Sequence, residues 1–247
     1  MHELGLTRSV RRHDHAVFTA DTFVRAALPG MKKAAAIIHA APAIGAGFTQ
    51  YTAEMESGGC LGDLPASCER FLYVIDGKVS AGFAEKAHTL TKDDYAYIPQ
   101  QLHHSVVATT ESKLAIVEKR YLPLDGVRPP AAFSSRASSV ASEPLEGGDE
   151  TVAVRHLLPD DMAFDCAVNV MTYQPGATLP MVEIHVMEHG LLMLEGGGIY
   201  RLGEHWYPVA AGDFIWMGPY CPQWFGALGK GVARYLIYKD WNRHPLT

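Results

Sequence analysis

The sequence has few cysteines, and no two of them are spaced for metal binding. Cys60, Cys68, Cys166 and Cys221 are scattered along the chain without a C-x-x-C pair. This pattern argues against both a zinc knuckle and a disulfide framework. We therefore expect all four side chains to be reduced thiols.

Long apolar runs and clusters of basic residues are also lacking. No stretch reaches the roughly 20 apolar residues that a transmembrane helix needs, and the N-terminal residues contain no apolar segment typical of a secretory signal. No Lys/Arg run exceeds two residues, and the formal net charge is −6, so neither nucleic acid nor a membrane is an expected partner. We expect a soluble, cytoplasmic protein.

A helical period of 3.6 residues is nearly absent, whereas short strand patterns broken by Gly, Pro and Asp are frequent. Residues 48–55, for example, alternate apolar and polar side chains, as a half-buried strand does. Hydrophobic residues make up 48% of the chain, which is enough for a buried core. The sequence therefore predicts an all-β fold of barrels or jelly rolls.

The chain repeats itself with an offset of 119 residues. The matching positions are Glu69 and Glu188, Leu72 and Leu191, Gly77 and Gly196, Glu85 and Glu204, Asp94 and Asp213, and the aromatic pairs Tyr95/Tyr97 and Phe214/Trp216. Such a duplication predicts two tandem β-barrels in one chain. The predicted divisions are an N-terminal segment packing on the barrels (1–47), an N-terminal barrel (48–127), a linker (128–155) and a C-terminal barrel (156–247).

Side chains able to bind a metal gather in the second repeat. Glu183, His185 and His189 have the spacing i, i+2 and i+6, so in an extended strand all three point to one side. Burying a carboxylate and two imidazoles together without a cation is energetically costly. We predict a metal site made of Glu183, His185 and His189, with Gln223 as the fourth ligand.

Glu188 is an alternative third ligand. Strand alternation directs its side chain away from the other ligands. A β-bulge would reverse that direction, because one inserted residue re-aims the side chains that follow.

The donor types indicate which metal and which substrate the site takes. One carboxylate, two imidazoles and one amide suit an open octahedral Mn²⁺ or Fe²⁺ site better than a closed zinc site. With a single carboxylate ligand, the bound dication keeps net positive charge and attracts an anionic group. A small acidic molecule is therefore the expected partner.

The first repeat lacks most of these ligands. Leu64, Ala66 and Arg70 stand at the positions of Glu183, His185 and His189, and only His104 stands opposite Gln223, so that three of the four ligands are missing. We predict that the N-terminal barrel holds no metal and that His103 and His104 are structural.

The two ligand motifs resemble those of the cupin superfamily. The first is Glu183-x-His185-x3-His189-x6-Gly196, and the second is the segment 212–223, which begins with Gly-Asp and ends with Pro-Gln. The second motif departs from the usual pattern, because Gln223 replaces a histidine and Gly218 replaces a proline. Together with Tyr235-x3-Lys239, these residues resemble the (S)-ureidoglycine aminohydrolases, which are manganese bicupins of purine and allantoin breakdown. The resemblance covers residues from about 48 to the C-terminus.

This resemblance implies a fold, an activity and a set of site residues. The fold is a bicupin, and the activity is Mn²⁺-dependent hydrolytic deamination of (S)-ureidoglycine to (S)-ureidoglycolate and ammonia. Glu183 and Lys239 are implied as catalytic residues, and Tyr200, Tyr235, Lys239 and Glu183 as contacts of a small ureido acid. The alternative for the tyrosines is a packed core position, and for Lys239 a place at the rim. We also expect a homo-oligomer.

Two other functions remain open from the sequence. A site with two histidines and one carboxylate can also hold iron and activate O₂, as in a cupin dioxygenase or oxidase acting on a small acid. A non-catalytic bicupin that only binds a ligand is the third class.

Overall fold

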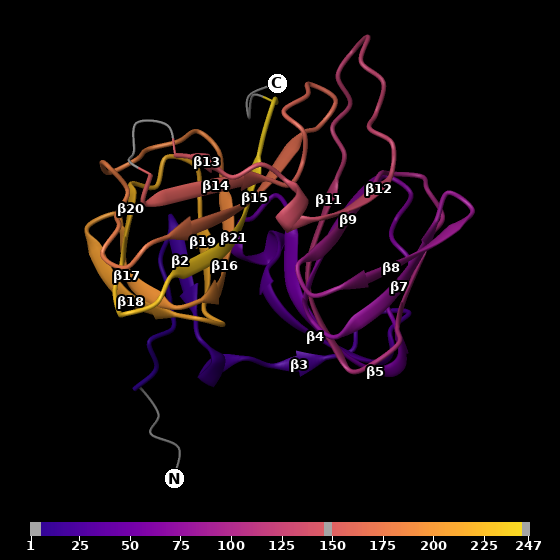
Figure 1. Ribbon diagram of the computed structural model, residues 1–247, viewed down its shortest axis with the longest axis horizontal. Helices are drawn as coiled ribbons and strands as arrows, with labels where there is room; N and C mark the ends of the chain where they lie inside the picture. The colour runs from indigo at the N-terminus through magenta and orange to yellow at the C-terminus, as the bar shows by residue number, and fades with distance from the viewer. Residues whose placement is uncertain (1–5, 146–149, 244–247) are drawn as a thin grey trace. The chain divides into compact units, whose positions relative to one another are not determined.

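The computed structural model describes residues 6–145 and 150–243. Over these ranges regular structure consists of strands and three short 3-10 helices, η1 (Ala20–Thr22), η2 (Pro42–Ile44) and η3 (Ala137–Ser139), which confirms the all-β prediction (Figure 1). None of the described helices is long and apolar enough to span a membrane. The chain forms two compact units: unit 1 takes the described parts of Met1–Phe23, Ala141–Asp160 and Cys166–Thr247, and unit 2 takes Val24–Val140 and Asp161–Asp165.

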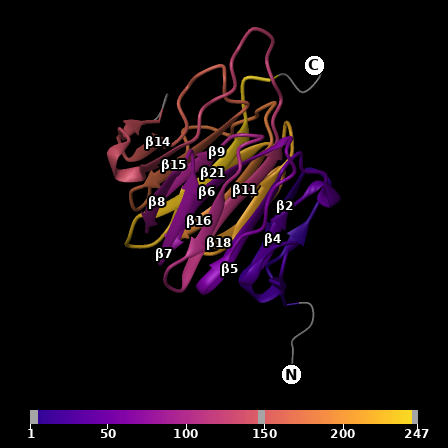
Figure 2. The ribbon, with the colours of Figure 1, turned by 90° about the vertical axis from the view of Figure 1, so that its right-hand side faces the viewer.

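Unit 2 is built on one ten-stranded antiparallel sheet. Its path runs β12-β9-β6-β11-β5-β10-β7-β8, with β3 and β4 attached through β5, and Figure 2 shows β4, β5, β11 and β6 side by side. The strands are β3 (Arg25–Ala26), β4 (Lys32–Ala40), β5 (Thr49–Cys60), β6 (Cys68–Asp76), β7 (Lys78–Phe83), β8 (Lys86–Thr91), β9 (Asp94–Ile98), β10 (Ser105–Ala108), β11 (Ser112–Arg120) and β12 (Phe133–Arg136).

Unit 1 contains an eight-stranded sheet and a three-stranded sheet. Their orders are β1-β2-β19-β16-β21-β15-β14-β13 and β18-β17-β20. The strands are β1 (Val10–Arg11), β2 (His15–Phe18), β13 (Glu143–Pro144), β14 (Val152–His156), β15 (Cys166–Tyr173), β16 (His189–Glu195), β17 (Gly197–Leu202), β18 (His205–Ala210), β19 (Phe214–Met217), β20 (Gln223–Ala227) and β21 (Ala233–Asp240).

The 119-residue repeat of the sequence appears in the strands themselves. Adding 119 to the bounds of β7 and β8 gives the bounds of β17 and β18. Every second residue of β7 and of β17 is buried, as expected where one face of a strand meets the core. Tyr200 occupies such an inward position, equivalent to Ala81 in the first repeat.

A buried glutamate and an aromatic partner are also repeated. The Tyr97 hydroxyl donates to Glu69 Oε2 at 2.6 Å, and Trp216 Nε1 donates to Glu188 Oε2 at 3.1 Å. Both glutamates are buried, so each carboxylate is supplied with a hydrogen-bond donor in place of water. The duplication therefore preserves a polar pair inside each unit and not only the strand pattern.

The strand that precedes each repeat in the sequence pairs with a strand of the other repeat and so extends that repeat's sheet. β2 pairs with β19 in unit 1, with Val17 opposite Ile215, and β12 pairs with β9 in unit 2, with Ser134 opposite Ala96. The predicted segment 1–47 is thus divided in the structure: residues 10–18 supply strands to unit 1, and residues 25–40 supply strands to unit 2. The predicted linker 128–155 likewise contains β12, β13 and most of β14.

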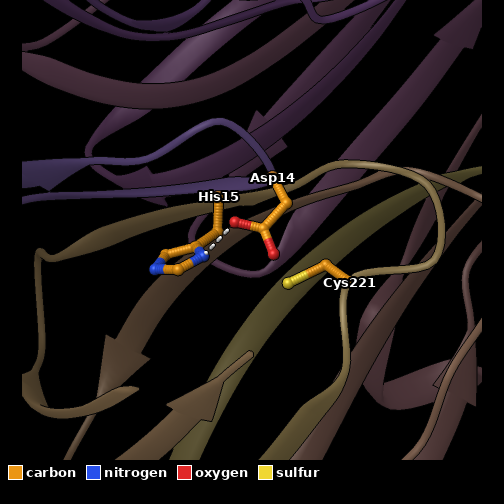
Figure 3. Close-up of side chains that lie close together, drawn as sticks. All are labelled: Asp14, His15 and Cys221. Atoms are coloured by element: carbon orange, nitrogen blue, oxygen red, sulfur yellow. Dashed lines mark hydrogen bonds and ion pairs between the residues drawn. The ribbon is translucent and has the colours of Figure 1, made fainter. Parts of the chain in front are cut away.

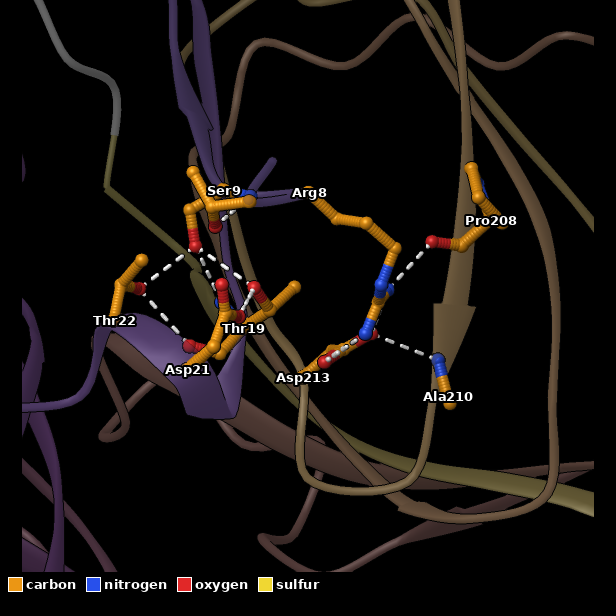
Figure 4. A network of polar contacts seen from close by, with 9 residues as sticks. Arg8, Ser9, Thr19, Asp21, Thr22, Pro208, Ala210 and Asp213 are labelled. Carbon is orange, nitrogen blue, oxygen red and sulfur yellow. Dashed lines mark hydrogen bonds and ion pairs between the residues drawn. The ribbon is translucent and has the colours of Figure 1, made fainter. Parts of the chain in front are cut away.

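Ion pairs fix both of these leading segments. Arg8 donates to both carboxylate oxygens of Asp213 and to Pro208 O, at 2.6, 3.1 and 2.9 Å, beside a network of hydroxyl groups that includes Ser9 (Figure 4). In unit 2, Arg136 Nε donates to Asp94 Oδ1 at 2.8 Å. Each aspartate lies at the start of an inner strand, so the arginine ties the added strand to that sheet.

Unit 2 also buries an acidic group next to a lysine. Lys119 Nζ contacts Asp165 Oδ2 and lies 3.9 Å from Glu69 Oε1. Burial, followed by repulsion from the Asp165 carboxylate, raises the pKa of Glu69 to about 8. The folded protein therefore keeps this proton to a higher pH than the unfolded chain, in which the pKa is 4.5.

We expect this group to make unit 2 less stable as the pH rises. The stabilisation that protonated Glu69 contributes is complete below pH 4.5 and is lost as the pH rises to about 8. Between these values the free energy of unfolding should fall by up to about 1.4 kcal/mol per pH unit. Glu69→Gln keeps the contact with Tyr97 but cannot titrate, so its urea unfolding midpoint should fall less over this range than that of the wild type. Glu56→Gln, at an exposed position, is the matched control. Equal slopes for the wild type and Glu69→Gln would contradict the assignment.

Candidate functional site

Unit 1 encloses a cavity of about 710 Å³. Its walls come from β15, β16, β17, β20 and β21 and from the segments that precede β15 and β16. All seven predicted site residues line it: Glu183, His185, His189, Gln223, Tyr200, Tyr235 and Lys239. The structure therefore brings together residues that are up to 56 positions apart in the sequence.

The local structure around the ligands differs from the prediction. Glu183 and His185 do not continue a strand to His189: β16 begins only at His189, and the residues before it form a loop. Glu183 N donates to Gln223 O and Gln223 N donates to Glu183 O, at 2.8 and 2.9 Å, while Tyr220 N donates to His185 O at 2.6 Å. These bonds pair backbone N–H and C=O groups of the loop although the loop is not part of a continuous strand. The ligands are therefore not brought together by strand alternation.

The predicted ligands are neighbours in this arrangement. His185 Nε2 and Glu183 Oε2 are 3.1 Å apart, and the rings of His185 and His189 lie edge to face with centroids 5.4 Å apart. The backbone pairing described above holds Gln223 against Glu183. The ligand atoms of Glu183, His185 and His189 are not all within 4.8 Å of one another, so the three side chains line the cavity without forming a closed cluster.

The buried histidine supports a fit with a divalent ion. His189 is 3% exposed, and no hydrogen-bond partner for its Nδ1 lies in the described part of the chain. Burial lowers the pKa of His189 to about 3, so the ring is neutral at neutral pH, which is the form that binds a metal. One carboxylate, two imidazoles and one amide oxygen without a thiolate match the donors that octahedral Mn²⁺ or Fe²⁺ accepts.

Tyrosine hydroxyl groups extend the polar surface of the cavity. Tyr200 donates to Gln223 Oε1 at 3.3 Å, and the hydroxyl groups of Tyr173 and Tyr235 are 2.7 Å apart. Burial raises the pKa of each tyrosine well above its ordinary value, so all three remain protonated and can donate hydrogen bonds. Tyr173 is not among the residues that line the cavity, and its hydroxyl reaches the site only through that of Tyr235; in the sequence it has the pattern of an ordinary core aromatic.

Lys239 faces the cavity beneath an aromatic ring. Its Nζ lies 4.0 Å from the centroid of the Trp241 ring, and Trp241 Nε1 donates to Asp160 Oδ1 at 3.2 Å. Burial lowers the pKa of Lys239, and the carboxylates of Glu183 and Asp160 oppose that shift. A cation–π contact restricts the ammonium without neutralising it, so Lys239 presents a positive charge to the cavity. Trp241 lies two residues after Lys239, a spacing from which strand alternation could have predicted it.

Glu188, the alternative third ligand, is engaged elsewhere. Its carboxylate accepts a hydrogen bond from Trp216 Nε1 at 3.1 Å, and its backbone N donates to Asp240 Oδ1 at 2.6 Å. Glu188 is not among the residues that line the cavity. Its position anchors the end of the loop directly before His189.

A second group of potential ligands fixes the segment before Gln223. Asp14, His15 and Cys221 bring one ligand atom each within 4.8 Å of the others, and Figure 3 shows His15 and Asp14 joined by a hydrogen bond. Both ring nitrogens of His15 are engaged, at 2.9 Å from Asp14 Oδ1 and 2.9 Å from Tyr207 Oη. Burial and the neighbouring Asp14 raise the pKa of Cys221 to about 12, so the thiol keeps its proton. The group ties β2 to the turn that leads into β20.

The equivalent position in unit 2 holds a guanidinium group. Arg70 is 3% exposed and lies 2.7 Å from Glu118 Oε1, while its Nη1 is 2.8 Å from His104 Nε2 and its Nη2 donates to Gly62 O at 2.9 Å. This buried cation donates to the acceptors around it and would repel a dication. That the N-terminal barrel holds no metal stays a prediction.

Comparisons with known proteins match both repeats to cupin families. Residues 44–121 match the family described as EutQ-like cupin domain, and residues 169–238 match the family described as Cupin domain. A solved structure, the putative glyoxylate-induced protein from Pseudomonas aeruginosa, aligns with a TM-score of 0.90 at 31% identity, over 99% of this chain and 94% of that one. The bicupin fold predicted from the sequence is confirmed.

Curated relatives are similar over nearly the whole chain. The probable (S)-ureidoglycine aminohydrolase of Oryza sativa subsp. japonica is 42% identical over 98% of this chain and 78% of its own length. The (S)-ureidoglycine aminohydrolase of Arabidopsis thaliana is 41% identical over 98% of this chain and 80% of its own length. With two cupin repeats and this extent of identity, the chain belongs to the (S)-ureidoglycine aminohydrolase family of bicupin enzymes.

Proposed function

We propose that the protein catalyses the hydrolytic deamination of (S)-ureidoglycine to (S)-ureidoglycolate and ammonia, as a step in purine and allantoin breakdown. The observation that carries this proposal is the shared cavity, in which four potential metal ligands, a lysine and two tyrosines face one space. The substrate has a carboxylate, an amine and a ureido group. The cavity offers a cation to the carboxylate and several neutral hydrogen-bonding side chains to the amine and the ureido group.

Glu183, His185, His189 and Gln223 are the residues that would hold the metal, which we propose is Mn²⁺, although Fe²⁺ accepts the same donors. A bound dication would supply Lewis-acid polarisation and a fixed orientation for the reacting groups.

Lys239 is proposed to bind the substrate carboxylate. Among the described residues that line the cavity, Lys239 is the only lysine or arginine. Its Nζ lies over the ring of Trp241. A partly buried ammonium forms a stronger contact with a carboxylate than an exposed one, because less water competes. Tyr200 and Tyr235 are proposed to orient the remainder of the molecule through their hydroxyl groups.

Glu183 is proposed to move a proton as well as to bind the metal. Hydrolysis breaks the bond between the substrate carbon and its amine nitrogen and forms a bond from that carbon to the oxygen of water. One proton must therefore pass from water to the departing amine. The Glu183 carboxylate is 25% exposed and faces the cavity, so it can accept the proton from water and deliver it to the nitrogen.

The experiment is to incubate Mn²⁺-loaded protein with freshly generated ureidoglycine, which also decays without enzyme, and to follow ammonia release and product chirality. We expect faster ammonia release and a single (S)-ureidoglycolate enantiomer, with both effects lost after the metal is removed with a chelator and regained on adding Mn²⁺. Release should be unchanged without oxygen.

Two results would count against this function. A racemic product formed at the uncatalysed rate would remove the hydrolase proposal. Oxygen consumption by the iron-loaded protein, together with loss of turnover under anaerobic conditions, would instead support a cupin dioxygenase or oxidase.

A further inference from the structure

Asn169 places an amide in the cavity that the metal ligands and Lys239 do not account for. It lies on β15, where Ala167, Asn169 and Met171 alternate toward the cavity. Asn169 is 5% exposed, and its Oδ1 has no hydrogen-bond partner among residues 6–145 and 150–243. The amide oxygen is thus removed from water, while the residue itself belongs to the wall of a cavity large enough for a ligand.

The sheet register places Asn169 next to the proposed carboxylate site. Asn169 lies opposite Ile237, and Ala167 lies opposite Lys239. Lys239 is therefore a diagonal neighbour of Asn169 on the same face, at a separation of about 7–8 Å between backbone positions. Tyr235 is the other diagonal neighbour, so the amide stands between the cationic and the phenolic side chains of β21.

An unpartnered buried carbonyl is unfavourable for the protein alone, because burial removes the hydrogen bonds that water would provide. A ligand with an N–H group restores the lost bond. A ureido group also offers a carbonyl oxygen, so it can accept a hydrogen bond from Nδ2 while one of its N–H groups donates to Oδ1. An amide side chain and a ureido group are thus complementary in both directions.

We propose that Asn169 recognises the ureido group of the substrate and makes the site specific for ureido acids. The inference rests on the proposed function and deepens it, because it assigns the end of the substrate that Lys239 does not bind. Asn169 is a specificity residue that touches the substrate at its ureido end, away from the bond that breaks.

The test compares two ligands that differ in the ureido group. Calorimetric titration of the Mn²⁺-loaded protein with (S)-ureidoglycolate and with glycolate, which lacks that group, gives the ureido preference as a ratio of dissociation constants. We expect the wild type to prefer (S)-ureidoglycolate, and Asn169→Leu to reduce the preference by about tenfold, as expected for two lost hydrogen bonds, while glycolate binding stays unchanged.

A stability measurement separates this role from a structural one. A structural asparagine would destabilise the protein when replaced, whereas Asn169→Leu should leave Tm unchanged or raise it by about 2–4 °C, because an unpaired buried carbonyl is removed. Gln50→Leu is the matched control. Gln50 is 1% exposed, and both its side-chain polar atoms lack hydrogen-bond partners among the described residues, but it belongs to unit 2. It should keep the full ureido preference.

The outcomes distinguish this inference from the proposed function. Loss of the ureido preference in Asn169→Leu, with Tm maintained, supports the inference. A preference that persists in Asn169→Leu, while the wild type turns over ureidoglycine, overturns the role of Asn169 and leaves the proposed function intact. A wild type that shows neither a ureido preference nor turnover removes both.

Discussion

Glu183→Gln is expected to lower kcat by about 10³-fold, the contribution typical of a group that transfers a proton in the rate-determining step. Glutamine keeps the length of the side chain and an oxygen that can bind a metal, so Mn²⁺ binding should weaken much less than turnover. The two backbone hydrogen bonds between Glu183 and Gln223 do not depend on the Glu183 side chain, so they should hold the loop in place in the variant. Steady-state kinetics and Mn²⁺ titration of the same preparation measure the two effects.

Glu204→Gln is the control for this experiment. It removes the same charge from a side chain that is 90% exposed, so kcat and Mn²⁺ affinity should both match the wild type. If Glu183→Gln loses turnover and metal binding to the same extent, Glu183 serves only as a ligand and the proton must be carried by another group.

Lys239→Met is expected to raise KM by about 10²-fold, because a partly buried cation that pairs with a carboxylate is lost. Methionine preserves much of the apolar contact with Trp241, so the change isolates the charge. kcat should fall less than kcat/KM does, since Lys239 is proposed to bind the substrate and not to react with it. Lys239→Arg retains the charge and should recover part of the affinity.

Lys230→Met, at an exposed position, controls for the general loss of a positive charge. Its KM should equal that of the wild type. A Lys239→Met enzyme with unchanged KM would show that the substrate carboxylate is bound elsewhere, and the two tyrosines would then be the next groups to test.

The sequence could predict which residues form the candidate site because their chemistry is unusual for strands. A glutamate, two histidines and a lysine beside apolar residues need a common partner or water, whatever the local fold. The inward position of Tyr200 also followed from simple alternation, because every second residue of β17 is buried. Local patterns were sufficient wherever a residue's surroundings depended on its own strand.

The features that the sequence did not predict depend on contacts between segments that are far apart in the chain. The loop that contains Glu183 and His185 is shaped by hydrogen bonds to residues 220 and 223, which lie on another part of the chain. Asn169 has the pattern of an isolated polar residue in an apolar strand, and only the folded structure shows that it belongs to the wall of the cavity. Similarly, no local pattern reveals that β2 pairs with β19 instead of with its own repeat.

That last pairing has a consequence for the order in which the protein acquires its structure during synthesis. Val17 of β2 pairs with Ile215 of β19, so β2 leaves the ribosome 198 residues before its partner. Unit 2 takes its last residues from Asp161–Asp165 and can close much earlier. Because pairing across so long a separation is slow, β2 stays unpaired until β19 has been made, and unit 1 is expected to complete its fold after unit 2.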